Sequence, residues 1–534
     1  VIGGSSIEIL KRIEQSYKIN PEKIAFHSRE GEITYKELWE KSDKLATWIV
    51  GKKGEDITPI VVYGHKSPLM LVCFLACVKA GRAYCPVDLS MPHERIAAII
   101  KKVGNDIAFA TEEIPCEVEE VKLVDFISTN EINEIIDDIC CASSKHGTTP
   151  GADSKKRCDV SAEKIGSEYW VKDNDVFYII FTSGSTGEPK GVKISAASLE
   201  SFVGWMAGIA GEDGGTFLNQ APFSFDLSVM DLYTSLCTGG TLKSIDKELQ
   251  SDFKSLMEYL KDANINYWVS TPSFVDLCFT EPLFNGDTLS GLKKFLFCGE
   301  KLTKETATGL FERFKNAEII NTYGPTEATV AVTSIKIEKE MLNISRDLPI
   351  GVPKFGTELR VIDESLKEVD PPQKGELMIV GDTVSLGYFN DEEKTSKVFS
   401  ELEINSKTVR AYRTGDEGYI EDDGNYHITG RIDQQIKLHG YRIELGDIEQ
   451  NLLKIDGISG AAVVPKESEG RIKHLVAFIV KKGSSGDFSE RKLVKTELKN
   501  MLPSYMVPKK IEFVSTLPLT GNGKLDRKKL REMV

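Results

Sequence analysis

The sequence of 534 residues lacks a membrane-length apolar run, a surplus of positive charge and a secretion signal. A spanning helix needs about 20 consecutive apolar residues, and no segment approaches that length. The formal net charge of −14 argues against a nucleic-acid-binding surface, although it leaves room for a local basic patch. The opening stretch, VIGGSSIEILKRIEQ, has no basic region followed by an apolar one. We therefore expect a cytoplasmic protein without membrane insertion or bound nucleic acid. The missing initiator methionine leaves open whether this N-terminus is native.

The chain also lacks the cysteine density of a disulfide scaffold, since its 534 residues include only ten cysteines. Cys73 and Cys77 lie in the apolar run LVCFLACVKA, and Cys298 lies in FLFCGE. Such surroundings are typical of reduced core cysteines.

A polar segment over residues 137–165 holds a cluster of potential metal ligands. They are Cys140, Cys141, His146 and Cys158. Their spacing matches no zinc pattern, so we predict a surface insertion without a metal and assign it no function.

The pattern of apolar residues predicts an α/β fold. Up to about residue 350, short strands such as PIVVYGH alternate with helical stretches such as SPLMLVCFLACVKAG, which is typical of mostly parallel sheets covered by helices. Short strands and turns follow and indicate a β-rich subdomain, and a compact α+β module begins near residue 448. The length exceeds that of one typical core. We predict a large N-terminal domain over residues 1–432 and a small mobile C-terminal domain over residues 433–534.

The stretch FTSGSTGEPKGV, residues 181–192, directly follows a predicted buried strand. Its glycines let backbone N–H groups approach a ligand closely, and Lys190 adds a positive charge. The hydroxyl donors are Thr182, Ser183, Ser185 and Thr186. This combination indicates a cradle for phosphate oxygens. The Walker A spacing fails, because Pro189 stands five residues after Gly184, where a glycine is required. A flexible surface loop is the alternative.

Further stretches add candidate ligands of a nucleotide. In NTYGPTEATV, Tyr323 could stack on a base, Thr326 could reach a phosphate and Glu327 could hold Mg²⁺. In YRTGDEGYI, Asp416 is predicted to lie in a tight turn and to bind two ribose hydroxyls. In LTGNGKLDR, a glycine-flexed turn carries Lys524. Each alone has an ordinary structural interpretation, as a core tyrosine, a turn-capping aspartate or a solvated lysine.

Taken in this order, the glycine-rich loop, NTYGPTEAT, YRTGD and NGKLDR resemble the core motifs of the adenylate-forming superfamily. That superfamily includes acyl-CoA synthetases, firefly luciferase and peptide-synthetase adenylation domains. The resemblance extends from ITYKELWEKSDKLA to Lys524. It implies that ATP, with Mg²⁺, converts a carboxylate to an acyl-adenylate with release of pyrophosphate, and that a thiol then takes the acyl group.

The resemblance also assigns residues. The implied ATP-binding residues are Thr182, Ser183, Gly184, Ser185, Thr186, Lys190, Asn321, Thr322, Tyr323, Thr326, Asp416, Arg431 and Lys524. Lys524, Thr326 and Glu327 are implied to be catalytic, with Lys524 bridging the substrate carboxylate and the α-phosphate, and Glu327 also binding the metal. Asp433 matches a hinge. Lys437 and Gly440 would face the incoming thiol after the small domain rotates.

The substrate follows from QAPFSFDLSVMDLY. Asp226 lies where amino-acid-activating members carry the aspartate that pairs with the substrate α-ammonium, and a buried carboxylate needs such a cation. A helix N-cap is the alternative. Several stretches, FLFCGE among them, are most similar to a branch that loads D-alanine onto a carrier protein for teichoic-acid D-alanylation in the bacterial cell wall. Cys298 and Val330 are then implied to line the side-chain pocket, although Cys298 as a plain core cysteine fits equally.

We therefore expect a monomeric ligase that activates D-alanine and passes it to the phosphopantetheine thiol of a carrier protein. Two alternatives stay open. One is a peptide-synthetase-type adenylation domain for another small amino acid, and the other is a non-catalytic nucleotide-binding regulatory protein. The sequence has no carrier-protein serine motif before Val534, which favours a stand-alone ligase.

Overall fold

The computed structural model describes residues 9–115, 118, 124–143, 165–184, 188–212, 214–468, 471–481, 483–484, 486–519 and 525–534, with backbone alone at 140–143. Predicted residues outside this set are Ser185, Thr186, Lys524, His146 and Cys158. No helix within the described ranges is long and apolar enough to cross a membrane.

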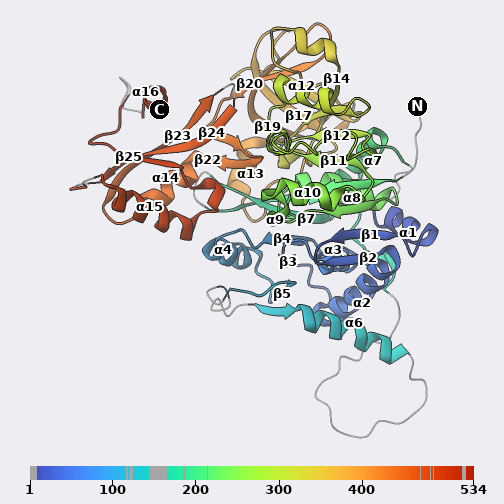
Figure 1. Ribbon diagram of the computed structural model, residues 1–534. Helices are drawn as coiled ribbons and strands as arrows, with labels where there is room; N and C mark the ends of the chain where they lie inside the picture. The colour runs from blue at the N-terminus through green and yellow to red at the C-terminus, as the bar shows by residue number, and fades with distance from the viewer. Residues whose placement is uncertain are drawn as a thin grey trace.

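Two large sheets form the N-terminal part of the molecule (Figure 1). The six-stranded sheet has the order β6-β5-β3-β4-β7-β8 and the nine-stranded sheet the order β15-β14-β13-β12-β11-β9-β10-β1-β2. Pairing is parallel in the first sheet except at β8, and parallel in the second from β1 through β10, β9, β11 and β12 to β13. The prediction of an α/β fold with mostly parallel sheets is confirmed.

The strands of the six-stranded sheet are β3 (Ile60–Gly64), β4 (Tyr84–Asp88), β5 (Ile107–Ala110), β6 (Asp125–Ser128), β7 (Val176–Thr182) and β8 (Lys190–Ser195). Those of the nine-stranded sheet are β1 (Ile24–Ser28), β2 (Gly31–Thr34), β9 (Thr216–Asn219), β10 (Thr241–Ser244), β11 (Ile265–Ser270), β12 (Lys294–Phe297), β13 (Glu318–Tyr323), β14 (Thr333–Ile337) and β15 (Val352–Pro353).

Helices pack on both sheets. They are α1 (Ile9–Ile19), α2 (Tyr35–Lys53), α3 (Pro68–Lys79), α4 (His93–Val103), α6 (Thr129–Ser143), α7 (Ala196–Ala210), α8 (Leu227–Cys237), α9 (Lys247–Ser251), α10 (Phe253–Leu260), α11 (Pro272–Cys278) and α12 (Lys304–Arg313). Helix α3 begins where the Ser67 side chain accepts from the Leu69 N–H and Pro68 takes the first turn. Helix α3 is apolar on nearly all sides and is buried in the largest core cluster, to which α8 also contributes its apolar residues.

A five-stranded antiparallel sheet follows, as the change to short strands predicts. It contains β16 (Thr357–Ile362), β17 (Gly375–Gly381), β18 (Phe399–Ile404), β19 (Lys407–Ile420) and β20 (Tyr426–Arg431), with α13 (Glu392–Val398) before β18. The C-terminal elements, red in Figure 1, form a separate group beside β20. They are the hairpin β21 (Gln435–Leu438) and β22 (Tyr441–Glu444), the sheet of β23 (Ile458–Ser468), β24 (Arg471–Lys481) and β25 (Lys510–Phe513), and α14 (Leu445–Leu453), α15 (Phe488–Met501) and α16 (Arg527–Glu532).

One sequence prediction needs correction. Asp416 does not lie in a tight turn: it belongs to β19 and pairs with Arg431 of β20. Gly415 takes a left-handed φ of 71° and bends the chain, but pairing continues on both sides of the bend, so the strand is not ended. The polar segment predicted as a surface insertion over residues 137–165 overlaps the end of helix α6, and because most of it lies outside the described residues, the insertion stays a prediction.

Candidate functional site

A cavity of about 230 Å³ lies where the N-terminal sheets meet the C-terminal hairpin. Its wall is formed at the carboxyl ends of β7, β9 and β12, by the segment after β13, by β19 and β20, and by the hairpin β21–β22. Parallel strands place their carboxyl ends at one edge of a sheet, which is where ligands bind in open α/β sheets. Predicted residues that line it are Thr182, Ser183, Asp226, Cys298, Thr326, Val330, Asp416, Arg431, Lys437 and Gly440.

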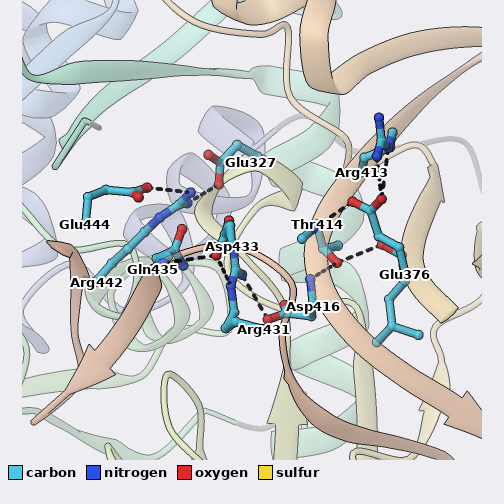
Figure 2. Close-up of polar contacts among 12 residues, drawn as sticks. Glu327, Glu376, Arg413, Thr414, Asp416, Arg431, Asp433, Gln435, Arg442 and Glu444 are labelled. Atoms are coloured by element: carbon cyan, nitrogen blue, oxygen red, sulfur yellow. Dashed lines mark hydrogen bonds and ion pairs between the residues drawn. The ribbon is translucent and has the colours of Figure 1, made fainter. Parts of the chain in front are cut away.

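The predicted ribose ligand Asp416 is held from two sides. The Tyr323 hydroxyl donates to Oδ2 of Asp416 at 2.6 Å, and Nη1 of Arg431 lies 2.9 Å from Oδ1. Arg431 also pairs with Asp433, Nη2 to Oδ2 at 2.5 Å (Figure 2). Burial alone would lower the pKa of Arg431, but the carboxylates of Asp416 and Asp433 raise it, so its guanidinium is charged. Two anions and one cation thus meet where β20 leads into β21.

Glu327 is the most deeply buried carboxylate of the site, with its side chain 0% exposed. Its Oε1 accepts from the Tyr388 hydroxyl at 2.8 Å, and its Oε2 lies 2.5 Å from Nη1 of Arg442 (Figure 2). Burial would raise the pKa of Glu327, but the charges of Arg442 and Lys190 outweigh it and lower the pKa to about 2. Glu327 is therefore ionised at neutral pH.

The phosphate-loop residues also contact β22. Nζ of Lys190 lies 3.5 Å from Oε1 of Glu444, and the Ser183 hydroxyl donates to the carbonyl of Arg442 at 2.9 Å. Gly184 is required as glycine, because an added Cβ would lie 2.2 Å from the Glu188 carbonyl oxygen. Any larger residue at this position would therefore clash with the backbone of Glu188.

Asp226 stands at the start of α8 on the cavity wall. Its side chain makes no capping hydrogen bond, so nothing in the geometry supports the alternative role as a helix cap. Burial raises the pKa of Asp226, opposed by hydrogen bonding to Thr326 and by the charge of Lys437. A further cation in the cavity would stabilise its ionised form.

Cys298 directly follows β12 and also lies on the cavity wall. It is 3% exposed and belongs to the apolar core cluster, yet it also lines the cavity. Its thiol donates to the Val330 carbonyl at 3.5 Å, and burial raises its pKa. Thr329 and Val330 both take positive φ, 57° and 70°, which is uncommon for such residues and turns the chain towards the cavity.

Asn321 and Thr322 lie behind the wall rather than on it. The Asn321 amide donates to the Pro349 carbonyl at 2.8 Å, and the Thr322 hydroxyl donates to the Phe297 carbonyl at 2.8 Å. Their side chains thus tie β13 to neighbouring segments in this arrangement.

Sequence reasoning missed Arg442, Glu444 and Tyr388. The first two stand in the stretch GYRIE, to which the sequence analysis assigned no role beyond Gly440, and Tyr388 lies in none of the motifs. Arg442 and Glu327 are separated by 115 positions, so no local spacing connects them.

Comparisons with known proteins agree with this geometry. Residues 13–389 match the family described as AMP-binding enzyme, and residues 447–524 match the AMP-binding enzyme C-terminal domain. A D-alanine–D-alanyl carrier protein ligase of Listeria welshimeri is 44% identical over 533 residues, covering 98% of this chain and 99% of the relative. A protein of the same name from Bacillus cytotoxicus is 43% identical over 527 residues, with the same coverage.

Solved structures share the fold. The Vibrio cholerae adenylation domain AlmE, in complex with glycyl-adenosine-5'-phosphate, has a TM-score of 0.80 at 21% identity and covers 100% of this chain and 99% of its own. An o-succinylbenzoate CoA synthetase double mutant from Bacillus subtilis has a TM-score of 0.81 at 18% identity and covers 98% of each chain. With both family models matched in order, this chain belongs to the AMP-binding enzyme family.

Proposed function

We propose that this chain is an AMP-forming ligase that activates D-alanine with ATP and transfers it to a carrier protein. Its relatives named for that activity are similar over nearly the whole of both chains. The structural observation that supports an amino-acid substrate is the Asp226 carboxylate on the cavity wall, which makes no helix-capping hydrogen bond. A substrate ammonium would supply the cation that such a carboxylate needs.

In the proposed first reaction, the D-alanine carboxylate attacks the α-phosphate of ATP, the bond to pyrophosphate breaks and D-alanyl-adenylate forms. The protein has to position two anions and neutralise charge. Asp416 would bind the ribose hydroxyls and Tyr323 would stack on the base, while Lys524 would bridge the two reacting anions. The loop residues Thr182 to Thr186 and Lys190 would hold the outer phosphates.

Mg²⁺ would neutralise phosphate charge when bound. Glu327 offers the hard carboxylate oxygens that this ion prefers. In the described arrangement Tyr388 occupies one of these oxygens and Arg442 the other. Glu327 would therefore be able to bind Mg²⁺ only after Arg442 has moved away from it.

In the proposed second reaction, the phosphopantetheine thiol of the carrier attacks the adenylate carbonyl, AMP leaves and a thioester forms. Lys437 and Gly440 on the hairpin line the cavity, and an added Cβ at Gly440 would lie 2.4 Å from Cγ2 of Thr271. The hairpin thus packs closely on Thr271 at Gly440, and we propose that the long thiol arm passes close to the backbone of this glycine. We propose that Asp433, between β20 and β21, is the hinge that separates domains 1–432 and 433–534.

The test is pyrophosphate exchange into ATP with D-alanine, L-alanine, glycine and D-serine, followed by mass measurement of a D-alanyl carrier protein. We expect D-alanine to give the highest kcat/KM and to load the carrier as a thioester. Preference for another amino acid would identify the peptide-synthetase alternative. ATP binding without exchange for any amino acid would identify a regulatory nucleotide-binding protein. We further propose that the enzyme works as a monomer in the cytoplasm, which native mass and fractionation would check.

A further inference from the structure

A buried lysine, Lys66, lies between β3 and α3 and is only 1% exposed. Its ammonium donates to Oδ1 of Asn219, the last residue of β9, and to the carbonyl of Ala221 at 2.5 Å. The same ammonium lies 4.8 Å from the centroid of the Phe223 ring. Lys66 thus contacts three alternate residues of the chain that leads from β9 towards Asp226.

Residues 220–226 connect β9 to α8 and belong to neither element. They nevertheless form a large part of the cavity wall, which includes Ala221, Pro222, Ser224, Phe225 and Asp226. A strand is held by its neighbours in the sheet and a helix by its own backbone hydrogen bonds, whereas a connecting segment relies largely on side-chain contacts. The position of the Asp226 carboxylate therefore depends on the residues that hold this segment.

A second contact ties the two ends of the segment together. Nδ2 of Asn219 donates to Oδ1 of Asp231 on α8 at 3.0 Å, and both residues are 0% exposed. Burial lowers the pKa of Lys66 to about 8, and the charge of Asp231 opposes this decrease, so the amine keeps its proton at neutral pH. Lys66, Asn219 and Asp231 thus form one buried polar cluster. Such clusters specify a single arrangement of the elements that they join.

We propose that Lys66 is a positioning residue for the amino-acid substrate: it fixes the segment 220–226, and through that segment the Asp226 carboxylate, against the cavity. This inference deepens the proposed function and rests on it, because that function assigns the substrate ammonium to Asp226. Lys66 does not line the cavity, so it acts through Asp226 rather than on the substrate. The residues proposed to bind ATP belong to other segments of the chain, so the effect of Lys66 should be confined to the amino acid.

The variant Lys66→Met keeps most of the apolar stem and removes the ammonium. We expect KM for D-alanine, or for whichever amino acid the exchange panel identifies, to rise by roughly 10- to 100-fold, since a misplacement of about 1 Å can cost about 10²-fold. KM for ATP should not change. Lys79→Met is the matched control, because Lys79 is 0% exposed and donates to Trp39, Ser42 and Asp43, none of which lines the cavity. The control should lower Tm and leave both KM values as they are. An equal rise of the two KM values in Lys66→Met, or no rise in either, would overturn the proposal.

A double variant separates position from charge. Lys66→Met alone leaves the buried Asp231 carboxyl without the nearby cation, and adding Asp231→Asn removes that carboxyl while its amide oxygen can still accept from Asn219. Removal of both members of a buried charged pair is often neutral for stability. We therefore expect the double variant to regain the Tm that Lys66→Met loses but to keep the raised KM, because the lysine donor to Ala221 is still missing. Recovery of KM together with Tm would show that Lys66 only balances charge, which would contradict a positioning role.

Hydrogen exchange gives a measurement that needs no substrate. The backbone N–H of Phe225 donates to the Pro222 carbonyl at 2.9 Å, and that of Val229 donates to the Asp226 carbonyl at 2.9 Å. Exchange at these amides therefore reports the order of the segment and of the first turn of α8. It should be several-fold faster in Lys66→Met and unchanged in the control variant. Wild-type exchange rates in Lys66→Met would overturn the proposal whatever the substrate is, whereas a wild-type enzyme without amino-acid-dependent pyrophosphate exchange would refute the proposed function.

Discussion

At the scale of single residues, we propose that Asp226 decides the class of substrate. Its carboxylate faces the cavity and makes no capping bond, so its replacement should act on ligand binding rather than on helix α8. We expect Asp226→Ala to raise KM for D-alanine by roughly 10²-fold or more, since removing one partner of a buried pair costs about 3–5 kcal/mol.

The measurement is pyrophosphate exchange with D-alanine varied at saturating ATP, and then with ATP varied. Asp226→Asn keeps the side-chain volume and should show the same loss, which separates charge from shape. A parallel increase in KM for ATP would instead indicate a structural role for Asp226.

A second prediction at the residue scale concerns Cys298 and the preference for D- over L-alanine. Its thiol bonds to the Val330 carbonyl, and both residues line the cavity. Cys298→Ala removes apolar volume without adding polarity, and differences of this kind are worth about 1–3 kcal/mol. We expect the preference for D- over L-alanine to fall by roughly 10- to 200-fold at most, with kcat/KM for D-alanine little changed. A D/L ratio equal to that of the wild type would show that Cys298 only fills the core.

At this scale, the sequence predicted which side chains line the cavity better than it predicted their ion-pair partners. The cavity does bring together Asp226, Cys298 and Asp416, which lie far apart along the chain. The pairing of Glu327 with Arg442 was not predictable, because it depends on how the C-terminal hairpin approaches the N-terminal sheets. A residue type reveals its chemistry, whereas an ion pair between distant segments requires their orientation.

At the scale of elements, the spacing of the apolar residues was sufficient to predict most helices and strands. The run PIVVYGH gives β3, and the apolar stretch after it gives α3. The exception is β19, which continues for 14 residues through Gly415 and Asp416. Glycine and aspartate are typical of turns, but here pairing with β17 and β20 overrides that local preference.

A prediction at this scale concerns strand β24, whose first residue, Arg471, contacts helices of the N-terminal part. Nη2 of Arg471 lies 2.7 Å from Oγ1 of Thr303, and the guanidinium also pairs with Asp276. Arg471→Ala should weaken the contact between the C-terminal elements and the N-terminal helices. A partly exposed ion pair contributes up to about 1 kcal/mol, and its hydrogen bonds add to that. We therefore expect transfer to the carrier to slow by about 2- to 10-fold. Pyrophosphate exchange should be unaffected.

The two half-reactions are measured separately, as exchange and as single-turnover transfer from D-alanyl-adenylate. Arg360→Ala is the control, because Arg360 pairs with Glu358 within the same strand of the N-terminal part. Equal slowing of exchange and transfer by Arg471→Ala would mean that this contact stabilises the fold rather than one orientation of the C-terminal elements.

At the scale of the whole molecule, the orientation of the C-terminal elements determines which of their faces meets the cavity. The hairpin β21–β22 lines it, whereas α16 lies on the side of these elements away from the N-terminal sheets (Figure 1). Arg527 of α16 pairs with Glu449 on α14, at 2.6 Å between Nη1 and Oε1, so α16 moves with its own group. Arg527, the last residue of the motif NGKLDR, is also the first residue of α16, so the rotation that we propose would have to carry this group to the cavity for the motif to act there.

Lys524, in that motif, lies outside the described residues, and its role is tested through this rotation. We expect Lys524→Ala to abolish D-alanine-dependent pyrophosphate exchange, because the point charge that we propose to bridge the two reacting anions is lost. Transfer from preformed D-alanyl-adenylate should stay within about 3-fold of the wild type. Lys437→Ala provides the mirror comparison, since Lys437 sits on the hairpin that already lines the cavity and should affect transfer more than exchange. Separate measurement of exchange and transfer for both variants shows whether the two lysines act in different half-reactions. If each variant loses both reactions to the same extent, one orientation serves the whole cycle and the rotation is not needed.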